Sequence, residues 1–324
     1  MLILAIETSC DDTSLALVKN GKEIVETFTS TQIKEHELYG GVVPEVAARV
    51  HEVWLPLILQ KMSLKEKQID AIAVTEGPGL HGSLMLGQMM AKSLAFLLQK
   101  PLIKVNHLEG HIYSNFIEKD PVFPAMVLIV SGGHTHLYLM KGHSQYELIG
   151  KTKDDAVGEA FDKAARMLGL GYPGGPAIEK LAQNGDSQKI NFPKVQMPQF
   201  DFSYSGLKTA VLQMIKKDPG ISKADIAASF QKAAFDQVIN KAIEACLTSK
   251  VKYLFVAGGV SANQYLRTEL TTRAKQNNIE VYVPPMKYCT DNASMIGVAA
   301  YYKSKDEKNF SPLDFSAQPS LKLG

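Results

Sequence analysis

Residues 125–136 read A-M-V-L-I-V-S-G-G-H-T-H, an apolar run that ends in a glycine-rich polar turn. A short apolar run bounded by turn residues is typical of a buried strand. The same order opens the chain, where Leu2–Ile6 is apolar and Glu7–Thr13 is polar. After each polar turn, two further short apolar segments are separated by a turn, Asn20-Gly21 in the first case and Lys141-Gly142 in the second. The pattern therefore predicts the same three-stranded start twice in one chain.

Each predicted hairpin is followed by a helical segment and then by a strand that runs into glycines. Ile69–Val74 leads into Gly77-Pro78-Gly79, and Tyr253–Ala257 leads into Gly258-Gly259 before a helix from about Ser261. This alternation predicts an α/β fold, and its repetition predicts two related lobes with a cleft between them. We assign residues 1–124 and about 296–324 to the first lobe, and residues 125–295 to the second, with an irregular insertion near residues 192–209.

Three longer helices are predicted from the spacing of apolar residues. Pro44–Met62 has apolar residues at helical intervals and a proline placed to begin the helix. Ser83–Leu98 follows the first glycine turn, and Ser222–Ser249 has Ser222 as its expected N-cap. The polar tail after about Ser304 is expected to pack on the surface.

The composition is that of a globular protein, with 324 residues of which 45% are hydrophobic and 21% charged. The formal net charge of +2 neither requires nor excludes a nucleic-acid partner, which would need a local basic patch or a helper subunit. The three cysteines are far apart and show no C-x-x-C spacing, which favours a reducing, cytoplasmic compartment. We expect neither a secretory signal nor a membrane span, because the N-terminus lacks a basic segment and the apolar runs are too short.

Two histidines stand four residues apart in N-H-L-E-G-H, directly after the predicted strand Pro101–Val105. On a helix, His107 and His111 would share one face and could bind one metal ion, although this spacing is also common by chance. A zinc protease needs a glutamate directly after the first histidine, but Glu109 stands one position too late. A third ligand would have to come from elsewhere. Asp291 is a candidate, or it is simply the N-cap of the last helix.

The two polar turns are candidates for phosphate binding, because a strand that ends in small residues exposes backbone N–H groups. Ordinary hairpin turns are the alternative. In the first turn Asp11 and Asp12 would repel a phosphate unless a cation or a proton is involved, which makes Asp11 a candidate acid/base or metal-associated residue. Asp162 has two interpretations, a surface acid paired with Arg166 or a ligand of a ribose hydroxyl. The chain lacks the glycine patterns of Rossmann and P-loop nucleotide sites.

Ten motifs in order give the chain a resemblance to a known family. They are E-T-S-C-D-D-T, G-G-V-V-P-E-V-A-A-R, G-P-G-L, N-H-L-E-G-H, V-S-G-G-H-T, G-E-A-F-D-K-A-A, G-Y-P-G-G-P, F-S-Y-S-G-L-K-T-A, A-G-G-V-S-A-N and C-T-D-N-A. Over essentially its whole length the chain closely resembles the bacterial TsaD family, the tRNA adenosine threonylcarbamoyltransferases once labelled O-sialoglycoprotein endopeptidases.

The resemblance implies the actin/sugar-kinase/heat-shock-ATPase fold, with two duplicated lobes around a nucleotide- and metal-binding cleft. It implies one divalent metal, Fe(II) in preference to Zn(II). Glu179 stands where bacterial members often carry aspartate, and His136 replaces a commoner glutamine, which we expect to have little effect. The implied metal ligands are His107, His111 and Asp291, and the implied substrate-binding residues are Ile129, Val130, Ser131, Gly132, Gly133, Asp162, Gly175, Glu179 and Asn263.

The implied reaction moves a threonylcarbamoyl group from threonylcarbamoyl adenylate to the exocyclic amine of the adenosine beside the anticodon of ANN-decoding tRNAs, and AMP leaves. Asp11 is the expected catalytic residue for the amine proton. The resemblance also implies two partners besides tRNA, a paralogous pseudo-enzyme (TsaB-like) and a small ATPase (TsaE-like). The alternatives are an ATP-dependent small-molecule kinase of the same fold and a metallopeptidase.

Overall fold

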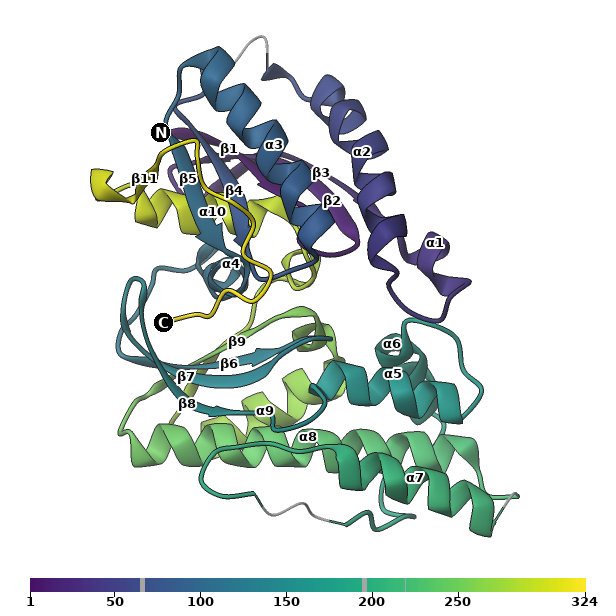
Figure 1. The fold of residues 1–324 in the computed structure, drawn as a ribbon. Coiled ribbons are helices and arrows are strands. Elements are labelled where there is room, and N and C mark those ends of the chain that lie inside the picture. The colour runs from purple at the N-terminus through teal and green to yellow at the C-terminus, as the bar shows by residue number, and fades with distance from the viewer. Residues whose placement is uncertain (65–67, 194–196, 219) are drawn as a thin grey trace. The chain divides into compact units, whose positions relative to one another are not determined.

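The computed structural model describes residues 1–64, 68–193, 197–218 and 220–324. The chain divides into two units (Figure 1). Unit 1 consists of Met1–Pro121 and Pro284–Gly324, and unit 2 consists of Val122–Val283. Residues 284–295, which we expected in the second lobe, thus belong to unit 1. No helix of the described residues is long and apolar enough to cross a membrane.

Unit 1 is built on a six-stranded sheet with the order β11-β5-β4-β1-β2-β3. Strands β1, β2 and β3 form an antiparallel meander, whereas β4 and β5 run parallel to β1. The carboxyl ends of β1, β4 and β5 therefore meet at one edge of the sheet. The strands are β1 (Leu2–Glu7), β2 (Asp12–Lys19), β3 (Glu23–Thr31), β4 (Ala71–Gly77), β5 (Leu102–Asn106) and β11 (Phe310–Ser311).

Helices cover both faces of this sheet. Alternate side chains of β1 and β2 point to opposite faces. Leu4 and Leu17 join the core beneath α2 and α3, whereas Ala5 and Val18 lie against Gly297 of α10. The helices of unit 1 are α1 (Ile33–Glu37), α2 (Pro44–Lys61), α3 (His81–Leu98), α4 (His107–Tyr113) and α10 (Ala293–Lys303).

Unit 2 repeats this topology. Its sheet has the order β10-β9-β6-β7-β8. Strand β9 runs parallel to its neighbours β6 and β10, whereas β7 runs antiparallel to its neighbours β6 and β8. This matches β5-β4-β1-β2-β3 strand for strand, so the predicted duplication is confirmed. The elements are β6 (Ala125–Val130), β7 (Thr135–Gly142), β8 (Gln145–Lys151), β9 (Tyr253–Ala257), β10 (Glu280–Tyr282), α5 (Val157–Met167), α6 (Gly174–Ala182), α7 (Ser205–Lys217), α8 (Lys223–Thr248) and α9 (Gln264–Gln276).

The predicted helices occur at the expected places, with small differences at their ends. Ser222 is the N-cap of α8, because its side chain accepts a hydrogen bond from the Asp225 N–H. The predicted insertion near residues 192–209 is irregular only as far as Tyr204, since α7 begins at Ser205. Residues 194–196 of that insertion lie outside the described residues.

Candidate metal centre and anion-binding turn

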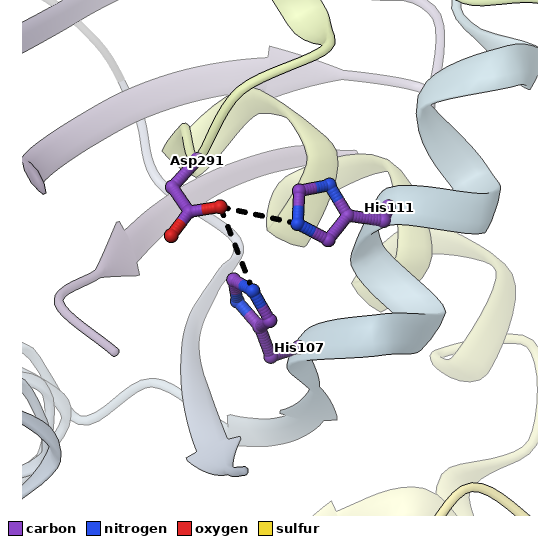
Figure 2. Close-up of side chains that lie close together, drawn as sticks. All are labelled: His107, His111 and Asp291. Atoms are coloured by element: carbon purple, nitrogen blue, oxygen red, sulfur yellow. Dashed lines mark ion pairs between the residues drawn. The ribbon is translucent and has the colours of Figure 1, made fainter. Parts of the chain in front are cut away.

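His107, His111 and Asp291 form a compact cluster in unit 1. Asp291 Oδ1 lies 3.1 Å from His111 Nε2 and 3.6 Å from His107 Nε2, and the three ligand atoms lie within 4.8 Å of one another. Figure 2 shows both imidazoles projecting from α4 toward the carboxylate. Two imidazoles and one carboxylate suit a divalent transition metal and leave positions open for a substrate. The residues present therefore fit the implied metal.

The two histidines are positioned by the transition from β5 to α4. The Asn106 side chain is the N-cap of α4 and accepts hydrogen bonds from the N–H groups of Leu108 and Glu109, at 2.9 and 3.4 Å. The cap begins the helix at His107, so His107 and His111 lie one turn apart on the same face. Their ring centroids are 4.6 Å apart.

Asp291 is positioned by the start of α10. The N-cap of α10 is Asn292, whose side chain accepts a hydrogen bond from the Met295 N–H at 3.0 Å. Asp291 is therefore not the cap that we considered, and its carboxylate is directed at the histidines instead. Because α10 packs on the sheet of unit 1, Asp291 belongs to the same unit as the two histidines and not to the second lobe.

Glu109 does not face the metal cluster. Its carboxylate Oε2 lies 3.5 Å from Lys303 Nζ at the end of α10, and its side chain is buried. The pair joins α4 to α10, the helix that Asp291 precedes. A carboxylate held by Lys303 is not directed at a metal-bound water, which agrees with the sequence argument against protease chemistry.

The second ring nitrogen of His107 faces Glu7 at the end of β1. Nδ1 lies 3.1 Å from Glu7 Oε2 and 3.0 Å from Ser9 Oγ. Burial opposes the charged imidazolium, but the Asp291 and Glu7 carboxylates outweigh it and raise the pKa of His107 to about 9. A metal ion has to displace the proton on Nε2.

The turn between β1 and β2 carries Asp11 and Asp12. Burial is the largest cause of the raised pKa of Asp11, and the charge of Asp291 adds to it. Burial and the same charge raise the pKa of Asp12 to about 8. Both carboxyl groups are thus close enough to Asp291 to respond to its charge. A carboxyl group whose pKa is raised toward neutrality is a better proton acceptor than an exposed aspartate.

In unit 2, the turn after β6 is tight and open to solvent. The Ser131 N–H donates to the His134 carbonyl at 2.8 Å, and the His134 N–H donates to Ser131 Oγ at 3.0 Å. Gly132 and Gly133 are exposed, and a Cβ built on either would meet nothing within 4 Å. The turn therefore presents two exposed glycines with room for an anion beside them.

Four other predicted substrate residues of unit 2 lie at or contact the N-termini of α6 and α9. Asp162 Oδ1 accepts a hydrogen bond from the Gly174 N–H at 2.7 Å at the start of α6, next to Gly175. At the start of α9, Glu179 Oε1 accepts from the Gln264 N–H at 2.7 Å, and Asn263 Oδ1 from the Leu266 N–H at 3.0 Å. The backbone of Asp162 leaves no room for a side chain at position 174. A Cβ on Gly174 would lie 2.5 Å from Asp162 Cα.

These contacts decide between the two interpretations of Asp162 only in part. Its carboxylate binds the α6 N-terminus, and its raised pKa comes first from burial. It is therefore not simply a solvated surface acid. Ile129 and Val130 are completely buried, so any contact they make with a substrate would have to use their backbone.

Four residues around the turn from Glu7 to Thr13 were not assigned from the sequence. Glu7, Ser9 and Thr75 lie in the hydrogen-bonded group around His107 Nδ1. His51 of α2 is completely buried, and its Nε2 lies 2.9 Å from the Cys10 carbonyl, directly before Asp11. The burial of charged or polar residues is the one signal that could have revealed them, and it is visible only in the fold.

Comparisons with known proteins agree with this arrangement. The family model described as tRNA N6-adenosine threonylcarbamoyltransferase (TsaD) matches residues 23–298. An enzyme of that name from Clostridium botulinum (strain Kyoto / Type A2) is 50% identical over 334 aligned positions, which cover 99% of this chain and 98% of the relative. The enzyme of that name from Staphylococcus haemolyticus is 50% identical over 311 positions, which cover 93% and 91%.

Solved structures with the same fold are much more distant in sequence. Full-length HypF in its phosphate- and nucleotide-bound form aligns with a TM-score of 0.64 and 16% identity, over 94% of this chain and 46% of HypF. Component A of the (R)-2-hydroxyglutaryl-CoA dehydratase of Acidaminococcus fermentans aligns with a TM-score of 0.55 and 17% identity, over 94% and 100%. These likenesses show that the fold is of the actin-like type. The family model and the close relatives show more, namely that the chain belongs to the tRNA N6-adenosine threonylcarbamoyltransferase family.

Proposed function

We propose that this tRNA threonylcarbamoyltransferase takes its acyl group from threonylcarbamoyl adenylate and transfers it to the exocyclic amine of the adenosine adjacent to the anticodon in ANN-decoding tRNAs. The amine nitrogen bonds to the carbamoyl carbon, the bond from that carbon to the phosphate oxygen breaks, and AMP leaves. The observation that carries the proposal is the cluster of two buried histidines, His107 and His111, with the half-buried Asp291, in a chain about 50% identical to enzymes of this name over nearly its whole length.

His107, His111 and Asp291 would hold one divalent metal ion, with Fe(II) preferred and Zn(II) as the alternative. When bound, the metal supplies Lewis-acid polarisation of an oxygen of the threonylcarbamoyl group. The chain's own contribution is orientation. Both imidazoles are nearly inaccessible to solvent, so the ligand atoms keep their places in one rigid turn of α4.

Asp11 would accept the proton that the attacking amine loses. Its raised pKa and the nearby charge of Asp291 support this role, because a carboxyl group with a raised pKa is a stronger base than an exposed aspartate. The buried ring of His51 supports the backbone directly before it. Asp12, with a pKa of about 8, stays largely protonated at neutral pH and adds little repulsion toward an anionic substrate.

Unit 2 would hold the adenylate part of the substrate. The exposed positions of Gly132 and Gly133 support phosphate binding by backbone N–H groups at the turn that begins with Ser131. The N-termini of α6 and α9 carry partial positive charge and lie beside the other four predicted residues. Those four residues are Asp162, Gly175, Glu179 and Asn263, and Ile129 and Val130 would contribute only backbone groups.

We also propose that the chain works in the cytoplasm with tRNA, a paralogous TsaB-like subunit and a small TsaE-like ATPase. A net charge of +2 supports sharing of the tRNA with other subunits.

The helices α2 and α3 pack against each other in unit 1 (Figure 1), and large apolar side chains are exposed on both. Such side chains are typical of protein interaction surfaces. They are Val53 and Leu57 on α2, and Met85, Met89 and Phe96 on α3.

One assay tests the proposed reaction. The chain, its partner subunits, unmodified ANN-decoding tRNA and threonylcarbamoyl adenylate are incubated together, and the digested tRNA is analysed by mass spectrometry. We expect threonylcarbamoyladenosine and an equal amount of AMP. Absence of the modified nucleoside from a reaction with folded, metal-loaded protein would contradict the proposal. Phosphate transfer to a hydroxyl group or cleavage of a glycoprotein would point to a kinase or a peptidase instead.

A further inference from the structure

Glu7 is completely buried at the end of β1 and lies beside the metal centre without being one of its ligands. Its Oε1 accepts a hydrogen bond from the Ser9 N–H at 2.5 Å. Its Oε2 accepts one from Thr75 Oγ1 at 2.5 Å and lies 3.1 Å from His107 Nδ1. Both oxygens of a buried carboxylate are thus engaged, as a charge removed from water requires.

The topology of the sheet brings these residues together. Strands β1, β4 and β5 are parallel neighbours, with β4 in the middle. Glu7 ends β1, Thr75 lies near the end of β4, and His107 directly follows β5. Carboxyl ends of parallel strands meet at one edge, so a side chain from the end of β1 reaches across β4 to the imidazole.

The contact between Glu7 and His107 selects one form of the imidazole. A carboxylate only accepts hydrogen bonds, so the nitrogen that faces it has to carry the proton. When a metal ion displaces the proton on Nε2, the proton on Nδ1 stays with Glu7, and the lone pair of Nε2 is left for the ion. The Ser9 hydroxyl, 3.0 Å from the same nitrogen, can either donate or accept and therefore selects neither form.

We propose that Glu7 is a positioning residue of the metal centre, which accepts a hydrogen bond from His107 Nδ1–H and so presents Nε2 to the metal ion. The inference rests on the proposed metal site. Carboxylates in this relation to a ligand histidine fix its orientation and strengthen metal binding. His111 offers a contrast, because its Nδ1 has no hydrogen-bond partner among the described residues. His107 is therefore the ligand whose orientation is fixed by its surroundings.

Substitution of Glu7 by glutamine tests this role with little change in volume. The amide can turn its NH2 group toward Nδ1 and favour the proton on Nε2, which removes the ligand lone pair. We expect E7Q to weaken Co(II) and Zn(II) binding about 10- to 100-fold in a chelator competition, and to alter the visible spectrum of the Co(II) protein. The matched control is E76Q at the end of β4, where the carboxylate pairs with Lys104 at 2.8 Å and not with a histidine.

The outcomes separate this inference from the metal site itself. A wild-type chain without stoichiometric metal would overturn the site and the inference together. Wild-type affinity in E7Q, with a lower unfolding temperature of the metal-free protein, would show a merely structural role for Glu7. Should E7Q fail to fold, nitrogen NMR of the histidine-labelled, Zn(II)-bound wild type decides, because we expect a hydrogen-bonded proton on His107 Nδ1. Zn(II) bound through Nδ1, or a proton on Nε2, would refute the inference.

Discussion

The substitution of Gly132 by alanine separates the stability of unit 2 from its proposed binding of a phosphate. Gly132 lies in the exposed turn after β6, and a Cβ placed on it would meet no atom within 4 Å. Its φ lies outside the left-handed region that favours glycine. The added methyl group is therefore compatible with the folded turn and enters only the space beside the backbone N–H groups.

The two effects have different expected sizes. Alanine restricts the unfolded chain, so the free energy of unfolding should stay the same or rise by up to about 1 kcal/mol. A phosphate kept away from a single backbone N–H loses a hydrogen bond to a charged group, worth about 1.5–3 kcal/mol. Since about 1.4 kcal/mol corresponds to a tenfold change in affinity, we expect AMP to bind about 10- to 100-fold more weakly.

Calorimetric titration with AMP and thermal unfolding of the same samples measure both effects. Gly258→Ala is the contrasting variant, because Gly258 has a φ of +91° and a Cβ there would lie 2.5 Å from the Val130 carbonyl oxygen. We expect G258A to lower the unfolding temperature, unlike G132A. If G132A binds AMP with the affinity of the wild type, the turn does not contact the phosphate and the assignment of unit 2 is wrong.

Three further predictions concern metal content, helix packing and pH. His111→Ala should abolish stoichiometric metal binding and transfer while the circular dichroism spectrum is retained; wild-type metal content would refute the ligand assignment. Gly110→Ala should lower the free energy of unfolding by about 1–3 kcal/mol and weaken metal binding. The reason is that the added Cβ would lie 2.8 Å from Ile296 Cδ1 and push α4 away from α10. An unchanged denaturation curve together with unchanged metal affinity would contradict this prediction. Burial, with a smaller effect from Lys151, lowers the pKa of His136 to about 4 from 6.5. As the pH falls, the unfolded chain therefore takes up a proton on His136 before the folded chain does. The free energy of unfolding should fall by about 1–2 kcal/mol between pH 7.5 and 5, and denaturant titration should not find this loss in His136→Gln.

The duplicated fold was predictable because it follows from local patterns. The six apolar residues of β6 and the glycine turn after them are short-range signals, and the same order recurs after Met1. The boundary of the second lobe was misplaced because Pro284-Pro285 signals a turn but does not indicate that residues 284–295 return to the first unit. Their membership in unit 1 depends on α10 packing across β1 and β2, a contact between the two ends of the chain that no local pattern reveals.

The three residues of the candidate metal cluster were predictable to different degrees. His107 and His111 are related by helical spacing, which the sequence shows directly. Asp291 was a candidate from the sequence but was equally a possible helix cap, and only the resemblance implied it as a ligand. Glu7 was quoted in a motif without a role. Its role depends on β4 lying between β1 and β5, and the order of strands in a sheet is a long-range property.

The two units place different chemistry at the same topological position. In unit 1 the first turn, after β1, carries Glu7, Asp11 and Asp12, whereas the matching turn after β6 in unit 2 carries Ser131, Gly132 and Gly133. An ionised carboxylate such as that of Glu7 stabilises a cation and its histidine ligands, whereas exposed glycines leave room for an anion. The fold is thus duplicated with turns of opposite chemical character, one suited to a cation and the other to an anion. This difference between the turns is one reason why the repeat is visible in the order of elements and not in residue identity.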